Sequence, residues 1–294
     1  MVTSKRTAKD TPTSTATDTP NNAKSRKKPP KAAARNGTHP ADTPAPPAEP
    51  PKPKSILVID VGGTNIKILA SGQTEPRRHT SGPGFTPQLM VQTVRELAGD
   101  WSYDAVSIGI PCQVGDHGPR QEPGNLGSGW VGFNYAAAFE RPVRIINDAA
   151  MQALGSYDGG RMLFLGLGTG LGSALIAENV IVPLELGNIP EPGGRTLGAI
   201  LGRRGMRLMG KKKWRKAVAW AIPALMASLL ADYVVIGGGN AKQIKVQPPG
   251  SRLSNNLTAF RGGYRLWHVE DVPTLRDGEE KPPETQKDAE WRLI

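Results

Sequence analysis

The sequence has a single cysteine, Cys112, among its 294 residues, which excludes an internal disulfide and any metal site built from several cysteines of one chain. It also lacks a run of 18 apolar residues, because Pro223 and polar neighbours interrupt the best candidate near residues 217–230, so we expect no membrane span. The N-terminal region has no apolar core followed by a small-residue cleavage site, which argues against a secretory signal. From these absences we expect a cytoplasmic protein without a membrane partner.

Aromatic residues are absent from residues 1–54, which contain no Phe, Trp or Tyr but eleven prolines. Such a segment cannot bury enough apolar surface to offset the entropy that ordering costs, so we expect a disordered N-terminal tail. The tail has eleven Lys and Arg against four Asp and Glu, and it carries +7 of the formal net charge of +11. We interpret it as a solvated basic spacer, and we expect no nucleic-acid partner beyond non-specific contact of this tail.

The rest of the chain has the composition and the patterning of folded α/β domains. The apolar content of 38% is sufficient for real cores. The patterns predict a hairpin over residues 55–70, a helix over 87–98 and a strand over 103–110, and later a strand over 233–236. This alternation is typical of α/β lobes. The charged, Pro-containing residues 270–294 predict a second loose tail.

An apolar strand ends at Asp60 and is followed by a tight turn that contains Gly62 and Gly63. We call residues 62–65 the first glycine turn. Glycines let backbone N–H groups approach an anion, the Thr64 hydroxyl adds a donor, and a carboxylate at the strand end can hold a hydrated Mg²⁺. The pattern therefore predicts a phosphate-handling turn. The alternative is an ordinary hairpin with an incidental acid.

Another short strand-like run ends at Asn147 and Asp148, and the Ala, Met and Leu residues that follow it predict a helix. Asp148 is thus expected at a strand-to-helix corner, where side chains project beyond the strand ends into the ligand-binding region of open α/β sheets. A carboxylate there can accept a hydroxyl proton. The alternative is that Asn147 or Asp148 merely caps the helix, and capping does not exclude catalysis.

The glycine pattern recurs in residues 163–176, where two apolar runs flank a turn that carries Thr169. We call residues 168–170 the second glycine turn. One such hairpin is weak evidence for phosphate binding. Two of them, about a hundred residues apart and with an acid between them, suggest two similar lobes that face one nucleotide.

Three motifs therefore occur in order along the chain: Asp60-Val-Gly-Gly-Thr-Asn-Ile-Lys67, Asn147-Asp148 and Leu165-Gly-Leu-Gly-Thr-Gly170. Together they resemble the ROK family of sugar kinases, members of the actin-like kinase superfamily. Three longer strings resemble its polyphosphate glucokinase branch: Glu122-Pro-Gly-Asn-Leu-Gly-Ser-Gly-Trp-Val-Gly-Phe133, Gly210-Lys-Lys-Lys-Trp-Arg215 and Tyr233-Val-Val-Ile-Gly-Gly-Gly-Asn-Ala-Lys242. The resemblance implies a two-lobed, actin-like and RNase H-like α/β fold, with lobes at residues 55–147 and 148–269.

By this resemblance the chain is expected to be a glucokinase. It would transfer a phosphoryl group from polyphosphate, and also from ATP, to the 6-hydroxyl of glucose. Asp148 would orient and deprotonate that hydroxyl, Asp60 would act through water on Mg²⁺, and the glycine-turn amides would hold the phosphates in line. The candidate residues for donor binding are Asp60, Gly62, Gly63, Thr64, Asn65, Lys67, Gly168, Thr169, Gly170, Gly238 and Gly239. For Gly238 and Gly239, a close packing turn between helix and strand is the alternative.

Sugar hydroxyls both donate and accept hydrogen bonds, which favours Asn, Asp and Glu side chains in a partly dry cleft. The candidate sugar-binding residues are Asn125, Asn147, Asp148, Glu185 and Asn188. By resemblance, Asn125 and Glu185 stand where relatives contact glucose. A surface acid is the alternative for Glu185.

Eight cations lie within fourteen residues: Arg203, Arg204, Arg207, Lys211, Lys212, Lys213, Arg215 and Lys216. A surface with so many positive charges can bind along a linear polyanion, as Lys and Arg side chains bind along the phosphates of a nucleic-acid backbone. We predict that Lys211, Lys212, Lys213 and Arg215 bind polyphosphate, with a solvated basic helix face as the alternative. Arg207, Lys211 and Arg215 would share one face of an unbroken helix, which Gly210 could interrupt. Pro223 is expected to kink the same helix.

Several positions depart from the family pattern. Asn188 stands where relatives usually have a His that often ligates zinc, and the cysteines of that site are absent, so we expect no zinc. Cys112 replaces a glycine of the usual turn and is expected to be a packed thiol rather than a nucleophile. Gly198 and Ala199 stand where acidic residues often occur.

These departures leave two other functions open. One is an ATP-dependent ROK hexokinase with a different sugar preference, and the other is a catalytically silent sugar sensor. A ROK transcriptional repressor is disfavoured because residues 1–54 cannot form a helix-turn-helix. Family members are often dimers, which implies a homodimer here.

Overall fold

The computed structural model describes residues 53, 55–255, 257–268 and 291–294. The chain divides into two units, residues 1–49 and 50–294, and every described residue belongs to the second. The predicted disordered tail therefore lies outside the described residues, apart from residue 53. In the described part of the chain, no helix has both the length and the apolar character that a membrane span requires.

The first sheet has five strands in the order β3-β2-β1-β4-β7. Their bounds are β1 Ile56–Val61, β2 Asn65–Ala70, β3 Arg77–Thr80, β4 Ala105–Ile110 and β7 Val143–Asn147. β1 pairs antiparallel with β2 and parallel with β4, and β7 is parallel to β4. β1 and β4 are buried along almost their whole length, as expected for continuous apolar strands in the middle of a sheet. The basic strand β3 is exposed at every residue and forms an edge.

Two helices and a small hairpin complete this part of the molecule. They are α1 Pro87–Ala98, α2 Tyr135–Phe139, and the strands β5 Val114–Gly115 and β6 Gly118–Pro119. The apolar side chains of α1 join those of β1 and β4 in one hydrophobic cluster. The observed α1 confirms the predicted helix over residues 87–98. The predicted strand over residues 103–110 begins only at Ala105.

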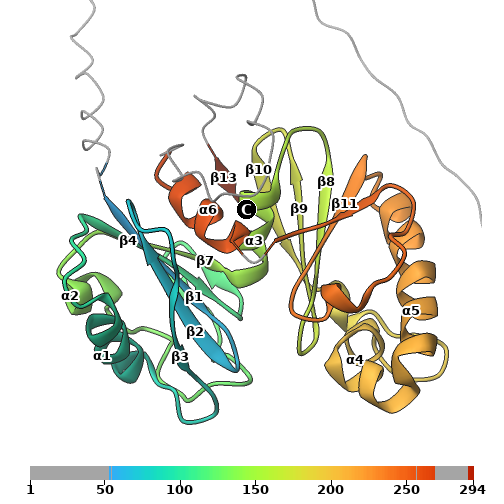
Figure 1. The fold of residues 1–294 in the computed structure, drawn as a ribbon, viewed down its shortest axis with the longest axis horizontal. Helices are drawn as coiled ribbons and strands as arrows, with labels where there is room; N and C mark the ends of the chain where they lie inside the picture. The colour runs from blue at the N-terminus through green and yellow to red at the C-terminus, as the bar shows by residue number, and fades with distance from the viewer. Residues whose placement is uncertain (1–52, 54, 256, 269–290) are drawn as a thin grey trace, which may run out of the picture. The chain divides into compact units, whose positions relative to one another are not determined.

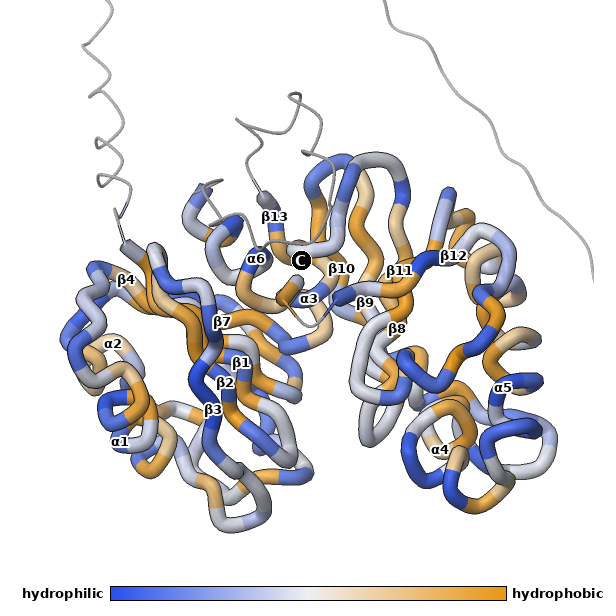
Figure 2. The backbone as a smooth tube through the Cα atoms, in the orientation of Figure 1, coloured by the Kyte–Doolittle hydropathy of each residue, from blue (hydrophilic) through white to orange (hydrophobic). Residues whose placement is uncertain are grey.

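The second sheet has six strands in the order β12-β11-β8-β9-β10-β13. Their bounds are β8 Met162–Leu167, β9 Leu171–Ala177, β10 Val180–Leu184, β11 Tyr233–Gly237, β12 Ser251–Leu253 and β13 Arg292–Leu293. β8, β9 and β10 form an antiparallel meander, and β11 is parallel to β8. Figure 2 shows the inner strands of both sheets mostly in the hydrophobic colour, as buried strands require.

The end of the chain corrects one expectation. Residues 270–294 are predicted above as a loose tail, and this is wrong for residues 291–294. The Arg292 N–H donates to the Asn179 carbonyl at 3.0 Å, and the Ile294 N–H donates to the Ile181 carbonyl at 3.1 Å. These hydrogen bonds add β13 to the edge of the second sheet beside β10. Residues 269–290 lie outside the described part.

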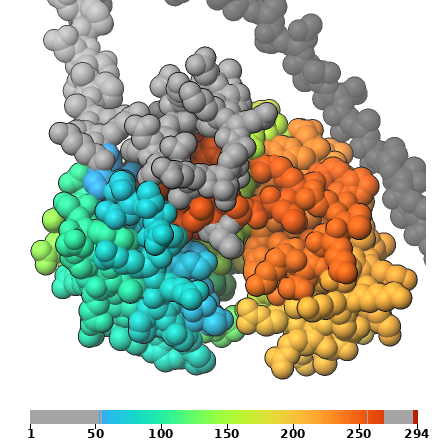
Figure 3. All heavy atoms as spheres, in the orientation of Figure 1, coloured from blue at the N-terminus to red at the C-terminus, as the bar shows by residue number. Residues whose placement is uncertain are grey.

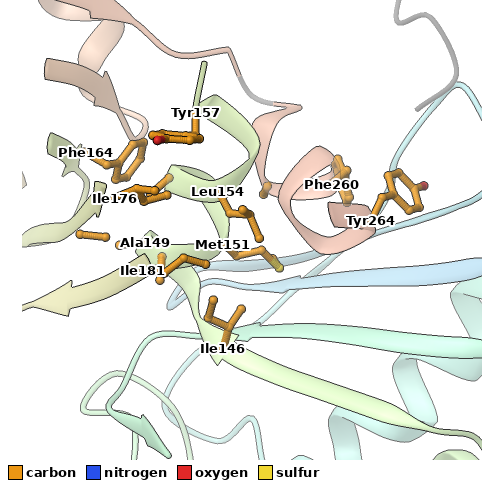
Figure 4. Close-up of a cluster of buried hydrophobic side chains, with 14 of the residues drawn as sticks. Ile146, Ala149, Met151, Leu154, Tyr157, Phe164, Ile176, Ile181, Phe260 and Tyr264 are labelled. Carbon is orange, nitrogen blue, oxygen red and sulfur yellow. The ribbon is translucent and has the colours of Figure 1, made fainter. Parts of the chain in front are cut away.

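Helices α3, Asp148–Ser156, and α6, Thr258–Arg265, pack on each other between the two sheets (Figure 1). Their backbones approach so closely that a Cβ atom on Gly155 or Gly262 would overlap the backbone of the opposite helix. α6 also returns to the first sheet, where the Ser107 hydroxyl donates to the Gly263 carbonyl at 2.6 Å. Figure 4 shows the apolar side chains of α3, α6 and the neighbouring strands meeting in one cluster. Both sheets thus share a core built on α3.

The remaining helices lie beside the second sheet. They are α4 Leu197–Leu201, α5 Arg203–Ser228, and the short 3₁₀ turns η1 Leu186–Asn188 and η2 Ala241–Gln243. α5 is interrupted at Gly210, whose φ of 77° and ψ of 155° are not helical. The predicted interruption at Gly210 is therefore confirmed, so Arg207 lies before the break whereas Lys211 lies after it. The residues around Pro223 keep helical backbone angles.

Candidate active site

The first glycine turn connects β1 to β2 and is closed by its own backbone. The Gly62 N–H donates to the Asn65 carbonyl at 3.0 Å. Ser81, just after β3, adds a second clamp, because its hydroxyl donates to the Gly62 carbonyl at 2.5 Å and its N–H donates to the Thr64 carbonyl at 3.0 Å. Thr64 and Asn65 remain exposed. The turn is therefore rigid at its base and open to a ligand at its tip.

Asp60 and Lys67 lie opposite each other in the β1–β2 register and form an ion pair. The Lys67 Nζ is 3.4 Å from a carboxylate oxygen of Asp60, and the two side chains are 37% and 13% exposed. Asp60 is thus shielded while its partner still reaches solvent. The motif contains both residues, but their pairing follows only from the hairpin register.

Asp148 is the first residue of α3, directly after β7, as the strand-to-helix corner predicted. Asn147 caps the helix, since its side-chain oxygen accepts the Ala149 and Ala150 N–H groups at 3.0 and 3.1 Å. The Asn147 amide donates to the Cys112 carbonyl at 3.1 Å. The cap is therefore confirmed for Asn147, and this leaves the carboxylate of Asp148 for another role.

The surroundings of Asp148 make its carboxylate basic. Burial, and next the negative charge of Asp60, raise the pKa of Asp148 to about 7, while hydrogen bonding from the Ala149 N–H at 2.8 Å opposes the rise. Glu185, from the second part of the chain, adds a smaller upward contribution to this pKa. A carboxyl whose pKa lies near neutrality at a strand-to-helix corner has the property that a general base requires.

The second glycine turn lies close to the same corner. Just beyond the turn, a Cβ atom on Gly172 of β9 would lie 3.0 Å from the Cβ of Ala149, the residue after Asp148. The turn also contacts the start of α5, where the Arg203 N–H donates to the Gly168 carbonyl at 2.9 Å. Thr169 and Gly170 are exposed. The second turn therefore connects the corner at Asp148 to the beginning of the basic helix.

The Glu185–Asn188 region forms a fixed turn beside β9. The Ser173 hydroxyl donates to the Leu184 carbonyl at 2.8 Å and accepts the Leu186 N–H at 3.1 Å. The Asn188 N–H donates to the Glu185 carbonyl at 2.9 Å. The side chains of Glu185 and Asn188 are exposed. The charge of Glu185 raises the pKa of Asp148 slightly, so the two carboxylates interact electrostatically.

The glycine turn after β11 packs tightly against the second glycine turn. Gly238 has a φ of 81°, and a Cβ atom on it would lie 2.7 Å from the Leu167 backbone. The Asn240 side chain donates to the Gly168 carbonyl at 2.8 Å. The close-packing interpretation of Gly238 thus has a structural basis, whereas Gly239 is exposed beside it.

Loop 122–131 brings Asn125 to the first glycine turn. A Cβ atom on Gly63 would lie 3.0 Å from the Cβ of Asn125. The Glu122 carboxylate accepts the Trp130 N–H at 3.0 Å and the Val131 N–H at 3.4 Å, so it closes the loop on itself. The role of Glu122 is not evident from the sequence, in which it is one of several acids.

Cys112 lies buried next to these groups. Burial, followed by the charges of Asp148, Glu122 and Glu185, raises the pKa of the Cys112 thiol to about 12. The thiol is therefore protonated at neutral pH and is a weak nucleophile, as predicted. The charges of carboxylates from three separate segments therefore all act on this thiol.

The cations of α5 are farther along the helix. Lys211, Lys212 and Lys213 are exposed after the break at Gly210. Arg215 is partly buried, and its Nε donates to the Gln243 carbonyl at 2.6 Å. The predicted polyphosphate residues therefore differ in the structure: the three lysines are exposed, whereas Arg215 is hydrogen-bonded to the Gln243 carbonyl.

Predicted residues from both halves of the chain thus gather around the start of α3. Figure 3 shows a furrow on this face between the atoms of the first sheet and those of α4 and α5. A separate pocket of about 620 Å³ lies among β7, the β5–β6 hairpin and β13, and it includes none of the predicted site residues. The described residues hold no group of three or more His, Cys, Asp or Glu side chains that could bind a metal ion.

The arrangement of the two sheets matches solved sugar kinases. An inorganic polyphosphate/ATP-glucomannokinase from Arthrobacter sp. strain KM superposes with a TM-score of 0.62 at 21% identity, over 72% of this chain and 98% of that one. A ROK family glucokinase from Streptomyces griseus, solved with glucose and AMPPNP, superposes with a TM-score of 0.57 at 15% identity, over 72% and 98%. This chain has the ROK sugar kinase fold. No protein-family model matches it.

The sequence is also similar to a curated relative. The polyphosphate glucokinase of Mycobacterium tuberculosis is 28% identical to this chain over 211 residues, which are 63% of this chain and 77% of the relative. The similarity to ROK sugar kinases that the motifs indicate is therefore confirmed, with polyphosphate glucokinases among the similar sequences. This match also confirms the predicted α/β sugar kinase fold.

Proposed function

We propose that this protein is a ROK-type sugar kinase, that glucose is its acceptor, and that polyphosphate, and also ATP, is its phosphoryl donor. The observation that carries the proposal is the basic carboxylate of Asp148 at the β7–α3 corner, with a glycine turn on either side. The residues expected to contact sugar are Asn125, Asn147, Asp148, Glu185 and Asn188. The similar proteins supply the choice of glucose and of polyphosphate.

In the proposed reaction, Asp148 accepts the proton of the sugar 6-hydroxyl as that oxygen attacks the terminal phosphorus of the donor. The bond from this phosphorus to the bridging oxygen breaks, and the shortened donor leaves with the electron pair. Asn147 keeps the corner in place through its cap, so Asp148 does not have to reorganise during transfer. The closing of two lobes, at residues 55–147 and 148–269, would exclude water from the donor.

The residues present fit a Mg²⁺ that is held mainly by the donor. Protein sites for Mg²⁺ commonly use one or two carboxylates together with substrate phosphates and water. Asp60 offers one shielded carboxylate next to the first glycine turn, and Asp148 is close enough for the two charges to interact. When bound, Mg²⁺ would neutralise charge on the phosphates. Asp60 would hold its hydration shell, and Thr64 and the turn amides other than that of Gly62, which is bonded to the Asn65 carbonyl, would orient the phosphate oxygens.

One contact and one surface feature support polyphosphate as the donor. The Arg203 N–H is bonded to the second glycine turn, so the basic helix begins where the donor phosphates are expected. After the break at Gly210, three exposed lysines extend the positive charge along the protein surface. A chain of phosphates held at the turn could continue along these lysines, whereas ATP would not extend to them.

The test is a comparison of donors. Glucose 6-phosphate formation is measured with Mg²⁺ and with polyphosphate or ATP at matched phosphate concentrations, and Asp148→Asn serves as the blank. Product from polyphosphate supports the full proposal. Product from ATP alone would support an ATP-dependent hexokinase and contradict the role of the lysines. A folded protein that binds sugar but makes no product with either donor would contradict the kinase assignment.

A further inference from the structure

Glu122 is not among the candidate site residues predicted from the sequence, yet its carboxylate makes two hydrogen bonds that define a loop. One oxygen accepts the Trp130 N–H at 3.0 Å, and the other accepts the Val131 N–H at 3.4 Å. The residues between them form loop 122–131, which contains Asn125. A carboxylate that accepts two consecutive backbone N–H groups fixes both ends of such a loop, since bonds to a charged acceptor are stronger than neutral ones.

The far end of the loop is anchored in the core. Trp130 is fully buried in the hydrophobic cluster of the first sheet. Its carbonyl accepts the Tyr135 hydroxyl at 3.0 Å. In the middle of the loop, the Gly127 N–H donates to the Phe85 carbonyl at 3.1 Å. Loop 122–131 is thus held at its end and centre, and Glu122 supplies the remaining attachment at its beginning.

The loop also contacts the first glycine turn through Asn125. Only 3.0 Å would separate a Cβ atom on Gly63 from the Cβ of Asn125. That separation is shorter than ordinary packing, so the absence of a side chain at Gly63 allows Asn125 to lie where it does. A residue of the expected phosphate-binding turn therefore also determines where a residue of the expected sugar site lies.

We propose that Glu122 is a positioning residue for sugar binding, which acts by holding loop 122–131 so that Asn125 is seated against Gly63. This inference rests on the proposed function, because it takes the sugar to bind at Asn125. The ligand class is a hexose, whose hydroxyls the Asn125 amide can both donate to and accept from. Gly63 shares this positioning role through its contact with Asn125.

The experiment measures direct hexose binding by calorimetry together with steady-state kinetics. For Glu122→Ala we expect the glucose Kd and the glucose KM to rise about tenfold while kcat changes less than twofold, since Asp148 is untouched. Glu122→Gln keeps one acceptor oxygen, so we expect a smaller rise of about threefold. Gly63→Ala should raise the glucose Kd in the absence of donor. Glu75 is an exposed acid between β2 and β3. Its substitution, Glu75→Ala, is the matched control and should leave the glucose Kd and the glucose KM unchanged.

Hydrogen exchange separates positioning from general loosening. In Glu122→Ala the Trp130 and Val131 amides should exchange faster, while the amides of β1 and β4 keep their wild-type rates. An unchanged glucose Kd in Glu122→Ala, with exchange of those two amides accelerated, would overturn the proposal. So would a kcat that falls as KM stays constant. Exchange that accelerates in β1 and β4 as well would also overturn it in favour of a structural role.

The outcomes also separate this inference from the proposed function. If the wild-type protein phosphorylates glucose but Glu122→Ala binds glucose normally, only the positioning role fails. If the wild type binds glucose without transferring phosphate and Glu122→Ala binds it weakly, only the kinase assignment fails. A wild-type protein that binds no hexose in calorimetry would overturn both.

Discussion

The corner at Asp148 and the basic segment of α5 hold their charges in opposite ways. Asp148 is partly buried, starts a capped helix, and experiences the negative charges of Asp60 and Glu185 from two other segments. Lys211, Lys212 and Lys213 are exposed and follow Gly210, where α5 is interrupted. The corner therefore has a geometry that exists before any ligand binds. The basic segment offers charge whose arrangement a flexible polyanion can fit, so substitutions should affect the corner much more strongly.

The largest effect is expected for Asp148→Asn. The amide keeps the size of the side chain but cannot accept a proton, so we expect kcat to fall by about 10³-fold while glucose still binds within about threefold of the wild-type Kd. Steady-state kinetics and calorimetry measure the two quantities. The control is Asp116→Asn, which changes an exposed acid in the β5–β6 turn and should leave kcat unchanged. An Asp148→Asn enzyme with more than a tenth of wild-type kcat would show that the corner does not carry the chemistry.

The pH dependence of the wild type comes next. Because burial and the Asp60 charge raise the pKa of Asp148 to about 7, the basic form is lost as the pH falls below 7. We expect log kcat/KM to rise with slope one up to about pH 7 and then to level off. In Asp60→Asn the neighbouring negative charge is gone, so the midpoint should move to lower pH. A wild-type profile that is flat from pH 5 to 8 would contradict the base assignment.

A smaller change is expected for Lys67→Met. It removes the cation that pairs with Asp60 at 3.4 Å and leaves a shielded carboxylate uncompensated. Near the donor phosphates this loss should raise the donor KM by about tenfold, since a hydrogen bond to a charged group contributes roughly 1.5–3 kcal/mol. The glucose KM should change less than twofold. Lys67→Arg, which keeps the charge, should retain most of the donor affinity; equal losses in both variants would show that charge is not the cause.

The smallest effect is expected when Lys211, Lys212 and Lys213 are all replaced by Gln. The polyphosphate KM should rise about fivefold at low salt, and its dependence on salt should become shallower, because fewer counterions are released on binding. The ATP KM should stay constant. Arg78→Gln, an exposed cation on β3, serves as the control. An unchanged salt dependence would leave these lysines as a solvated surface and weaken the contrast between the two regions.

Much of the fold and of the corner follows from local sequence. The apolar runs predict β1, β4 and β11, and the Pro-initiated amphipathic pattern predicts α1 with its observed bounds. Asn147 and Asp148 are recognisable as a strand-to-helix corner because capping and chain reversal both depend on adjacent residues. These features need no knowledge of distant contacts.

What the sequence does not reveal depends on contacts between distant segments. Ser81 clamps the first glycine turn from nineteen residues away along the chain, and Glu122 closes a loop on its own amides. β13 joins the second sheet through two hydrogen bonds that no local pattern marks. Likewise, the tethering of Arg215 to Gln243 depends on where η2 packs against α5. Exposed charges in particular give no indication of their partners, because solvent competes for them.

The decisive measurement is the ³¹P NMR spectrum of the wild-type protein incubated with Mg²⁺, glucose and polyphosphate, beside a parallel sample with ATP. We predict a growing sugar phosphate monoester resonance that requires glucose and is absent with Asp148→Asn. Its coupling to the two protons of a CH₂ group would identify the 6-position. A folded wild-type protein that binds glucose but yields no sugar phosphate from either donor would contradict the assignment of this corner to phosphoryl transfer.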